Sequence, residues 1–166
     1  MKRRLAGRPD KVERAFAKAL DLEMFKAPTL AYSDTIVNLR RLERHYLKQL
    51  GGDKFLAREV KRRIAEKALE FALFHGCKLS ICRARLKALS KLGFEDVERK
   101  AHWYLLYAKV AAARGHKRVA YAAVAATAKE LQRSLRRRKS LRCEQLLDLA
   151  GAYLRALPQF QPNPRQ

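Results

Sequence analysis

Acidic residues are scarce in this chain of 166 residues, because 16 Asp and Glu stand against 38 Lys and Arg. The formal net charge is +22. A charge of this size repels itself and opposes compaction unless a polyanion relieves it. Solubility alone is satisfied by a net charge of about 2–8 in a small domain. The shortage of acids therefore favours a polyanionic partner, and nucleic acid is the first candidate.

Cysteine is scarce too, and Cys77, Cys82 and Cys143 are an odd number without paired spacing. This pattern argues for a reducing compartment and against disulfides. His75, Cys77 and Cys82 could be drawn as three metal ligands, but their spacing matches no familiar zinc pattern. A buried structural thiol is the favoured interpretation, so no metal site is expected.

Long apolar runs are missing, and none approaches the ~20 residues of a membrane span. The basic start at 1–8 leads into a charged, patterned segment and not into the apolar region of a signal peptide. Gly51-Gly52 lacks the strand and the Gly-Lys-Ser/Thr sequence of a phosphate-cradling loop. We therefore expect a cytoplasmic protein without a cofactor and without membrane association.

Residue constellations typical of enzymes are also missing. The histidines His45, His75, His102 and His116 lie far apart in the sequence and belong to no ligand or triad motif. No paired-carboxylate site can be inferred, because the acids lie mostly on predicted helix surfaces. The prediction is a protein that is not an enzyme.

Helical periodicity is present almost everywhere, whereas strict alternation never persists long enough for a strand. Apolar residues make up 48% of the chain, which is enough for a core. The predicted class is all-α, with six or seven helices in a single-domain helical bundle or in stacked helical hairpins. The predicted organisation is a basic segment at 1–8, one helical domain at 9–157 and a Pro-rich tail at 158–166.

Side-chain caps and glycines mark the predicted helix boundaries. Asp34, Ser80 and Ser140 are expected to cap three helix starts, because their oxygens can accept from free backbone amides, and Asp53 restarts the chain after the glycines. Gly51-Gly52, Gly76, Gly93 and Gly115 are the expected stops. Glu95 and Asp96 fall in the first turn of the helix that ends near Gly115, where negative charge suits the helix dipole.

The segment from Tyr104 to Ala128 alternates bulky and small residues around a glycine. These residues are Tyr107, Ala108, Ala111, Gly115, Ala120, Val124 and Ala128. The segment resembles a single tetratricopeptide-type hairpin, in which small residues let two antiparallel helices approach. The pattern does not recur at a period of about 34 residues, so an ordinary Ala-rich helical hairpin is favoured.

Positive charge is densest towards the C-terminus, where ten basic residues and one acid, Glu130, lie between Arg114 and Arg142. The C-terminal basic cluster consists of Arg133, Arg136, Arg137, Arg138, Lys139 and Arg142, and Arg118 precedes it. The dipole at a helix C-terminus explains two or three cations there but not six. Arginine dominates this cluster, and its planar fork matches phosphate oxygens.

A second concentration lies between Phe71 and Phe94, where no acid occurs. Arg83, Lys87 and Lys91 are four residues apart, so they form a basic stripe on one helix face. The opposite face carries Cys82, Leu86 and Leu89. The basic stripe, the C-terminal basic cluster and Arg118 together are the predicted nucleic-acid-binding residues.

A third basic group is mixed with acids and has less weight as a binding site. It consists of Arg40, Arg41, Arg44, Lys48, Arg58, Lys61, Arg62 and Arg63, among Glu43, Asp53, Glu59 and Glu66. Glu59 and Arg63 are in i,i+4 register, which favours an ordinary surface pair. Trp103 is one position off the stripe of Tyr104 and Tyr107, so it is expected to be exposed and able to stack on a base.

These patterns predict a non-catalytic nucleic-acid-binding protein that holds RNA or another single strand through backbone phosphates. Duplex DNA is less favoured, because no zinc-finger spacing and no basic region with heptads occurs. A DNA-reading helix at 80–92 would be the alternative within this class. Strand-built RNA modules are excluded because no strands are predicted.

The chain is similar in size, charge and helicity to small helical subunits of ribonucleoprotein assemblies, including those of CRISPR effector complexes. Other subunits of a complex would then be partners as well. An alternative function is a helical-hairpin adaptor that binds an acidic protein through the same surface. A role at a membrane surface ranks third, because no helix joins this charge to a large apolar face.

Overall fold

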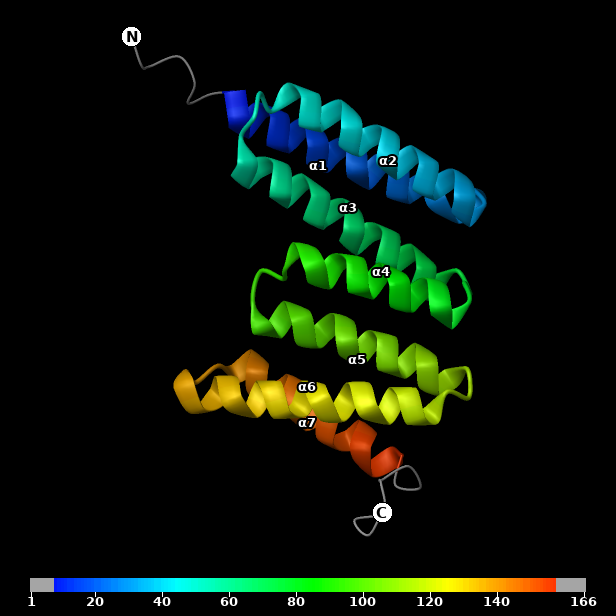
Figure 1. Cartoon of the computed structure of the whole chain (residues 1–166), viewed down its shortest axis with the longest axis vertical. Coiled ribbons are helices and arrows are strands. Elements are labelled where there is room, and N and C mark those ends of the chain that lie inside the picture. The colour runs from blue at the N-terminus through cyan, green and yellow to red at the C-terminus, as the bar shows by residue number, and fades with distance from the viewer. Residues whose placement is uncertain (1–7, 158–166) are drawn as a thin grey trace. The chain divides into compact units, whose positions relative to one another are not determined.

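The computed structural model describes residues 8–157, and side chains from residue 11 onward. The helices are α1 (Arg8–Lys26), α2 (Tyr32–Gln49), α3 (Lys54–Phe74), α4 (Leu79–Leu92), α5 (Val97–Ala113), α6 (Lys117–Arg137) and α7 (Leu141–Ala156), and a 3-10 turn (Ala27–Thr29) follows α1 (Figure 1). No strand occurs within these residues, so the all-α prediction with six or seven helices is confirmed. The predicted tail at 158–166 lies outside the described residues.

The chain divides between Gly93 and Phe94 into two compact units, one built from α1 to α4 and the other from α5 to α7. The expectation that 9–157 forms one domain stays a prediction.

Helix α3 is central to the first unit, because it contacts α1, α2 and α4. The buried cluster around it consists of Phe16, Leu20, Ile36, Leu39, Tyr46, Val60, Ile64 and Ala68. The rings of Phe16 and Tyr46 meet edge to face with centroids 5.3 Å apart, a preferred aromatic geometry that joins α1 to α2. Removal of these side chains from water is the main force that holds α1, α2 and α3 together.

The second unit is built on the α5–α6 hairpin, and α7 packs against both of its helices. The small and bulky residues of the predicted hairpin are all buried: Tyr107, Ala108, Ala111, Ala120, Val124 and Ala128. Gly115 in the turn has φ +81°, a left-handed conformation that favours glycine. The Ala-rich helical hairpin is therefore confirmed.

Side-chain oxygens cap the starts of α3, α5 and α7, and the cap predicted at Ser140 is confirmed. The Asp53 carboxylate accepts from the backbone amides of Phe55 and Leu56, both at 3.0 Å. The Ser140 hydroxyl accepts from the backbone amide of Cys143 at 3.3 Å. Asp96, expected only in a first turn, is the N-cap of α5 and accepts from the amide of Arg99.

The caps predicted at Asp34 and Ser80 are wrong. Helix α2 has Ala31 at its N-cap and α4 has Lys78, and neither helix start carries a side-chain cap. Both helices begin earlier than the polar residue. At the start of α2, Tyr32 stacks on Phe71 of α3 with ring centroids 5.9 Å apart, and this packing stabilises a helix start that includes Tyr32.

Candidate nucleic-acid interface

All of the predicted nucleic-acid-binding residues lie on the surface. The exposed side chains are Arg83, Lys87, Lys91, Arg118, Arg133, Arg136, Arg137, Arg138, Lys139 and Arg142. None of them forms an ion pair with any residue that the structure describes. Their charges are therefore available to a ligand.

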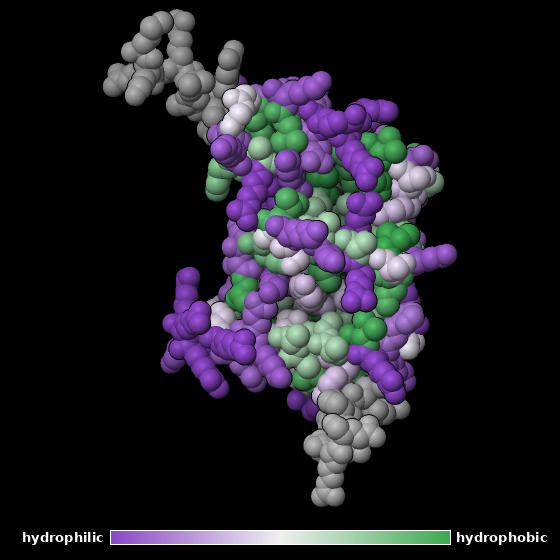
Figure 2. Space-filling view, in the orientation of Figure 1, coloured by the Kyte–Doolittle hydropathy of each residue, from purple (hydrophilic) through white to green (hydrophobic). Residues whose placement is uncertain are grey.

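The C-terminal basic cluster surrounds the turn between α6 and α7. Arg133, Arg136 and Arg137 lie in the last two turns of α6, Arg138 is its C-cap, and Arg142 is the second residue of α7. Figure 2 shows hydrophilic side chains projecting where Figure 1 draws this turn. The unpaired carbonyls at the end of α6 attract some of these cations, but the cluster has more cations than a helix end requires.

A cavity of about 560 Å³ lies beside this turn, within the second unit. Its lining includes Arg138 and Lys139, and also Asp96 and Glu98 from the start of α5. No acid lies between Arg133 and Arg142 in the sequence, but the fold brings two acids next to the cluster. The outer members of the cluster, Arg133, Arg136, Arg137 and Arg142, do not line this cavity.

Glu98 joins the start of α5 to the start of α7. The Ser140 hydroxyl donates a short hydrogen bond to the Glu98 carboxylate, and the Cys143 Sγ lies 3.6 Å from the same oxygen. Burial raises the pKa of the Cys143 thiol, and the nearby Glu98 charge raises it further although hydrogen bonds from Ser134 and Ser140 oppose this. A thiol held protonated is a poor nucleophile, and its contact with Glu98 links the start of α7 to the start of α5.

The basic stripe on α4 has the predicted geometry. Cys82, Leu86 and Leu89 are buried, and the three basic side chains of the stripe are exposed on another face. Arg118 lies in the first turn of α6 and the cluster in its last turns. At 1.5 Å per residue, about 22 Å of helix separates Arg118 from Arg133, so the fold does not bring Arg118 to the cluster.

The third basic group is only partly paired. Glu59 contacts Arg62 at 2.8 Å and Arg63 at 2.9 Å, so the predicted Glu59–Arg63 pair is confirmed. In contrast, Arg40, Arg41 and Arg44 are exposed and form no ion pair with a described acid. The mixture of acids and bases in this segment therefore predicted more ion pairing on α2 than the structure shows.

The prediction of an exposed Trp103 is wrong, because only 4% of its surface is exposed. The buried residues of α5 are Ala101, Trp103, Leu105, Tyr107, Ala108 and Ala111. At 3.6 residues per turn these positions cover more than half of the helix circumference, and Trp103 lies at the edge of that arc. A stripe based on Tyr104 and Tyr107 was too narrow, and the wide spread of apolar residues along α5 was the missed signal.

Metal and membrane sites find no support in the described part of the chain. No three His, Cys, Asp or Glu side chains gather there as a metal site requires. His75 instead stacks on Phe71 with ring centroids 3.8 Å apart, and the Cys82 thiol donates to the Ala72 carbonyl. Between residues 8 and 157, no helix is long and apolar enough to cross a membrane.

The chain was compared with known protein families, curated proteins and solved structures. No protein-family model, no curated protein and no solved structure matches the chain.

Proposed function

We propose that this chain is a non-catalytic nucleic-acid-binding protein that holds RNA or another single strand through its phosphates, as a small helical subunit of a ribonucleoprotein complex. The C-terminal basic cluster carries the proposal, because its six side chains are exposed and form no ion pair with a described residue. Guanidinium groups match the geometry of phosphate oxygens. Such contacts position a strand without reading its bases, so sequence preference is expected to be weak.

The surroundings of the only buried thiol in the second unit support the non-catalytic part of the proposal. Nucleophilic catalysis by Cys143 would need a thiolate, whereas burial and Glu98 keep this thiol protonated. The Ser140 hydroxyl beside it is used as a helix cap and as a donor to Glu98. Both groups have structural roles that explain their positions.

The test removes charge from the C-terminal basic cluster in the variant R136Q/R137Q/R138Q. Binding is measured by fluorescence anisotropy with labelled single-stranded RNAs of several unrelated sequences. We expect affinity to fall about tenfold or more, by similar factors for each sequence, because charged hydrogen bonds are lost. The log–log dependence on salt should flatten by about 0.7 for each lost phosphate contact. Gln is a good helix former, so the circular dichroism spectrum should remain helical.

The variant K11Q/R14Q/K18Q on α1 is the matched control. It removes the same charge from three exposed positions, on a helix that also carries Glu13, Asp21 and Glu23. Its effect on affinity should be clearly smaller. If R136Q/R137Q/R138Q left affinity and salt slope unchanged, the cluster would be solvated surface, and the adaptor for an acidic protein would become the leading hypothesis.

A further inference from the structure

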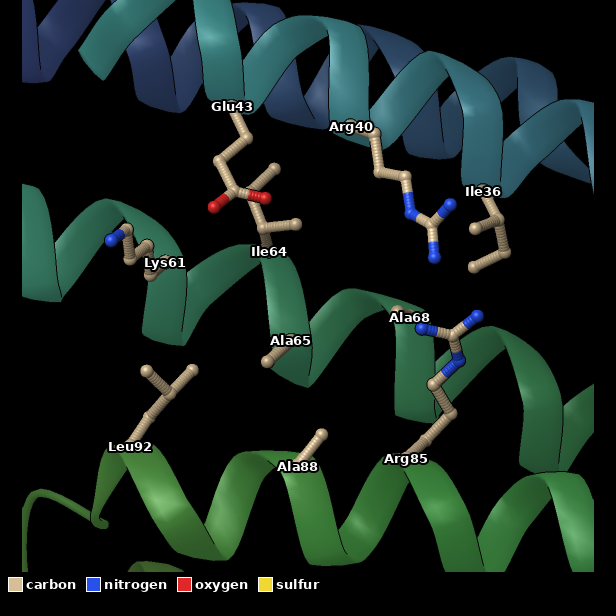
Figure 3. Close-up of a pocket in the computed structure, with 10 residues that line it drawn as sticks. All are labelled: Ile36, Arg40, Glu43, Lys61, Ile64, Ala65, Ala68, Arg85, Ala88 and Leu92. Atoms are coloured by element: carbon tan, nitrogen blue, oxygen red, sulfur yellow. The ribbon is translucent and has the colours of Figure 1, made fainter.

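A groove in the first unit brings together basic side chains that are far apart in the sequence. Helix α3 forms its floor, and α2 and α4 form its walls (Figure 3). Its volume is about 300 Å³. Arg40 projects from α2 and Arg85 from α4, and they face each other at one end of the groove (Figure 3). Neither residue is among those predicted to bind nucleic acid.

Arg85 is held in place by a neighbouring tyrosine. Its Nε donates to the Tyr32 hydroxyl at 2.8 Å, and its guanidinium carbon lies 5.8 Å from the centre of the Tyr32 ring. The terminal nitrogens of Arg85 donate to no residue that the structure describes. Because the side chain is already oriented, a ligand would lose less free energy in ordering it.

The arginine end of the groove lacks a compensating acid. Arg40 is exposed and has no ion-pair partner among the described residues. Glu43, the acid that lines this groove, lies at the opposite end, near Lys61 (Figure 3). Two like charges that share one end of a groove repel each other. An anion between them would attract both, and this attraction would outweigh their repulsion.

The floor and one wall offer small apolar surfaces beside this anion position. Ala65 and Ala68 of α3 and Ala88 of α4 line the groove, and their short side chains leave room for a flat group. A volume of about 300 Å³ is at the lower limit of small-ligand pockets. A helix of a protein partner has a diameter of about 10 Å and would not fit within it. A small anion attached to a planar apolar group suits the groove better.

We propose that this groove seats one nucleotide of a single-stranded nucleic acid, with a phosphate between Arg40 and Arg85 and the base against Ala65, Ala68 and Ala88. The proposal rests on the proposed function and adds a second phosphate contact, in the first unit. Tyr32 is a positioning residue that orients Arg85.

The first test compares wild-type protein with R40Q/R85Q and with Tyr32→Phe, using a labelled RNA of eight nucleotides. The double variant should bind about tenfold more weakly, with a salt slope smaller by about 0.7, because one phosphate contact is lost. Tyr32→Phe keeps the net charge and should still weaken binding by about threefold, because the hydroxyl that orients Arg85 is lost. Circular dichroism and thermal melting establish that each variant is folded.

A second test fills the groove without changing any charge. Ala88 and Ala84 are both exposed on α4, but only Ala88 lines the groove. Ala88→Leu should therefore weaken binding, whereas Ala84→Leu should not. A nucleoside monophosphate should also compete with the RNA better than inorganic phosphate or a poly-glutamate peptide does.

The outcomes separate this proposal from the proposed function. If wild-type protein binds the RNA and R40Q/R85Q binds it equally well, or if the two alanine variants behave alike, the groove proposal is wrong and the proposed function stands. Equal competition by inorganic phosphate would show a site for a bare anion, and stronger competition by the acidic peptide would show a protein partner. Either result would overturn the proposal that the groove binds a nucleotide. If the wild-type protein bound no oligonucleotide, both proposals would fail.

Discussion

At the scale of single residues, Glu59 holds two arginines of α3, and one of these arginines also contacts the first helix. Its carboxylate accepts from Arg62 and Arg63 within α3, and Arg63 also donates to Glu13 of α1 at 3.2 Å. Burial by itself would raise the pKa of Glu59, but the hydrogen bonds and charges of the two arginines outweigh burial and hold that pKa below its ordinary value. The folded state therefore favours the ionised carboxylate.

This lowered pKa predicts how stability depends on pH. A carboxylate with a lower pKa in the folded state contributes stability at neutral pH, and the contribution is lost as the pH falls through the folded-state pKa. Glu59→Gln should therefore be less stable than wild type at pH 7, by no more than about 1 kcal/mol for this partly buried network. The difference should shrink towards pH 3 in urea unfolding followed by circular dichroism. Asp21→Asn, at an exposed position, is the control, and a difference independent of pH would contradict this role of Glu59.

At the scale of helices, the polar residue before an apolar run is a cap only where the helix begins at that residue. Asp53 fulfils this condition and satisfies two backbone amides at the start of α3. Ser80 resembles it in the sequence, but α4 begins at Leu79 and its N-cap is Lys78. Asp53 and Ser80 therefore allow a matched comparison between a residue that caps a helix and one that does not.

Asp53→Ala should lower the free energy of unfolding by about 1 kcal/mol, the usual loss when a cap is removed. Ser80→Ala should be neutral or slightly stabilising, because Ser80 is already within the helix and Ala has the higher helix propensity. Chemical denaturation monitored at 222 nm measures both. Equal losses in the two variants would mean that the start of α4 depends on Ser80 after all.

At the scale of the whole molecule, the net charge of +22 is the dominant electrostatic property. Ion pairs between described residues occur on α3 and between α5 and α6, but 16 acids cannot pair with 38 cations. The rest of the positive charge repels itself, which destabilises the folded state. Added salt should therefore weaken the repulsion between like charges by more than it weakens the attraction within ion pairs.

The melting temperature should therefore rise when salt is increased from about 10 mM to 150 mM, as the Debye length falls from about 30 Å to about 8 Å. A single-stranded oligonucleotide at about 100 times its Kd should add about 2.7 kcal/mol at constant ionic strength, because it binds only the folded state. Scanning calorimetry with and without the oligonucleotide measures both effects. A melting temperature that falls with salt would show that ion pairs outweigh self-repulsion.

Local properties of this protein could be read from its sequence. The helical class follows from apolar spacing, which repeats within a few residues, and the Ala-rich hairpin from small residues around Gly115. The exposure of the C-terminal basic cluster could be predicted because its members are neighbours in the chain, and cations in such numbers stay hydrated. Arg83, Lys87 and Lys91 share a helix face for the same reason of short-range geometry.

The tertiary structure decided what no local pattern contains, namely which surfaces of different helices meet. Burial of Trp103 depends on how wide an arc of α5 is covered, and the acids beside the C-terminal basic cluster come from the start of α5. The convergence of Arg40 and Arg85 on one groove, and the orientation of Arg85 by Tyr32, require α2 and α4 to pack on opposite sides of α3. Apolar periodicity shows that a helix has a face to bury, but the partner of that face is chosen by packing between segments distant in the chain.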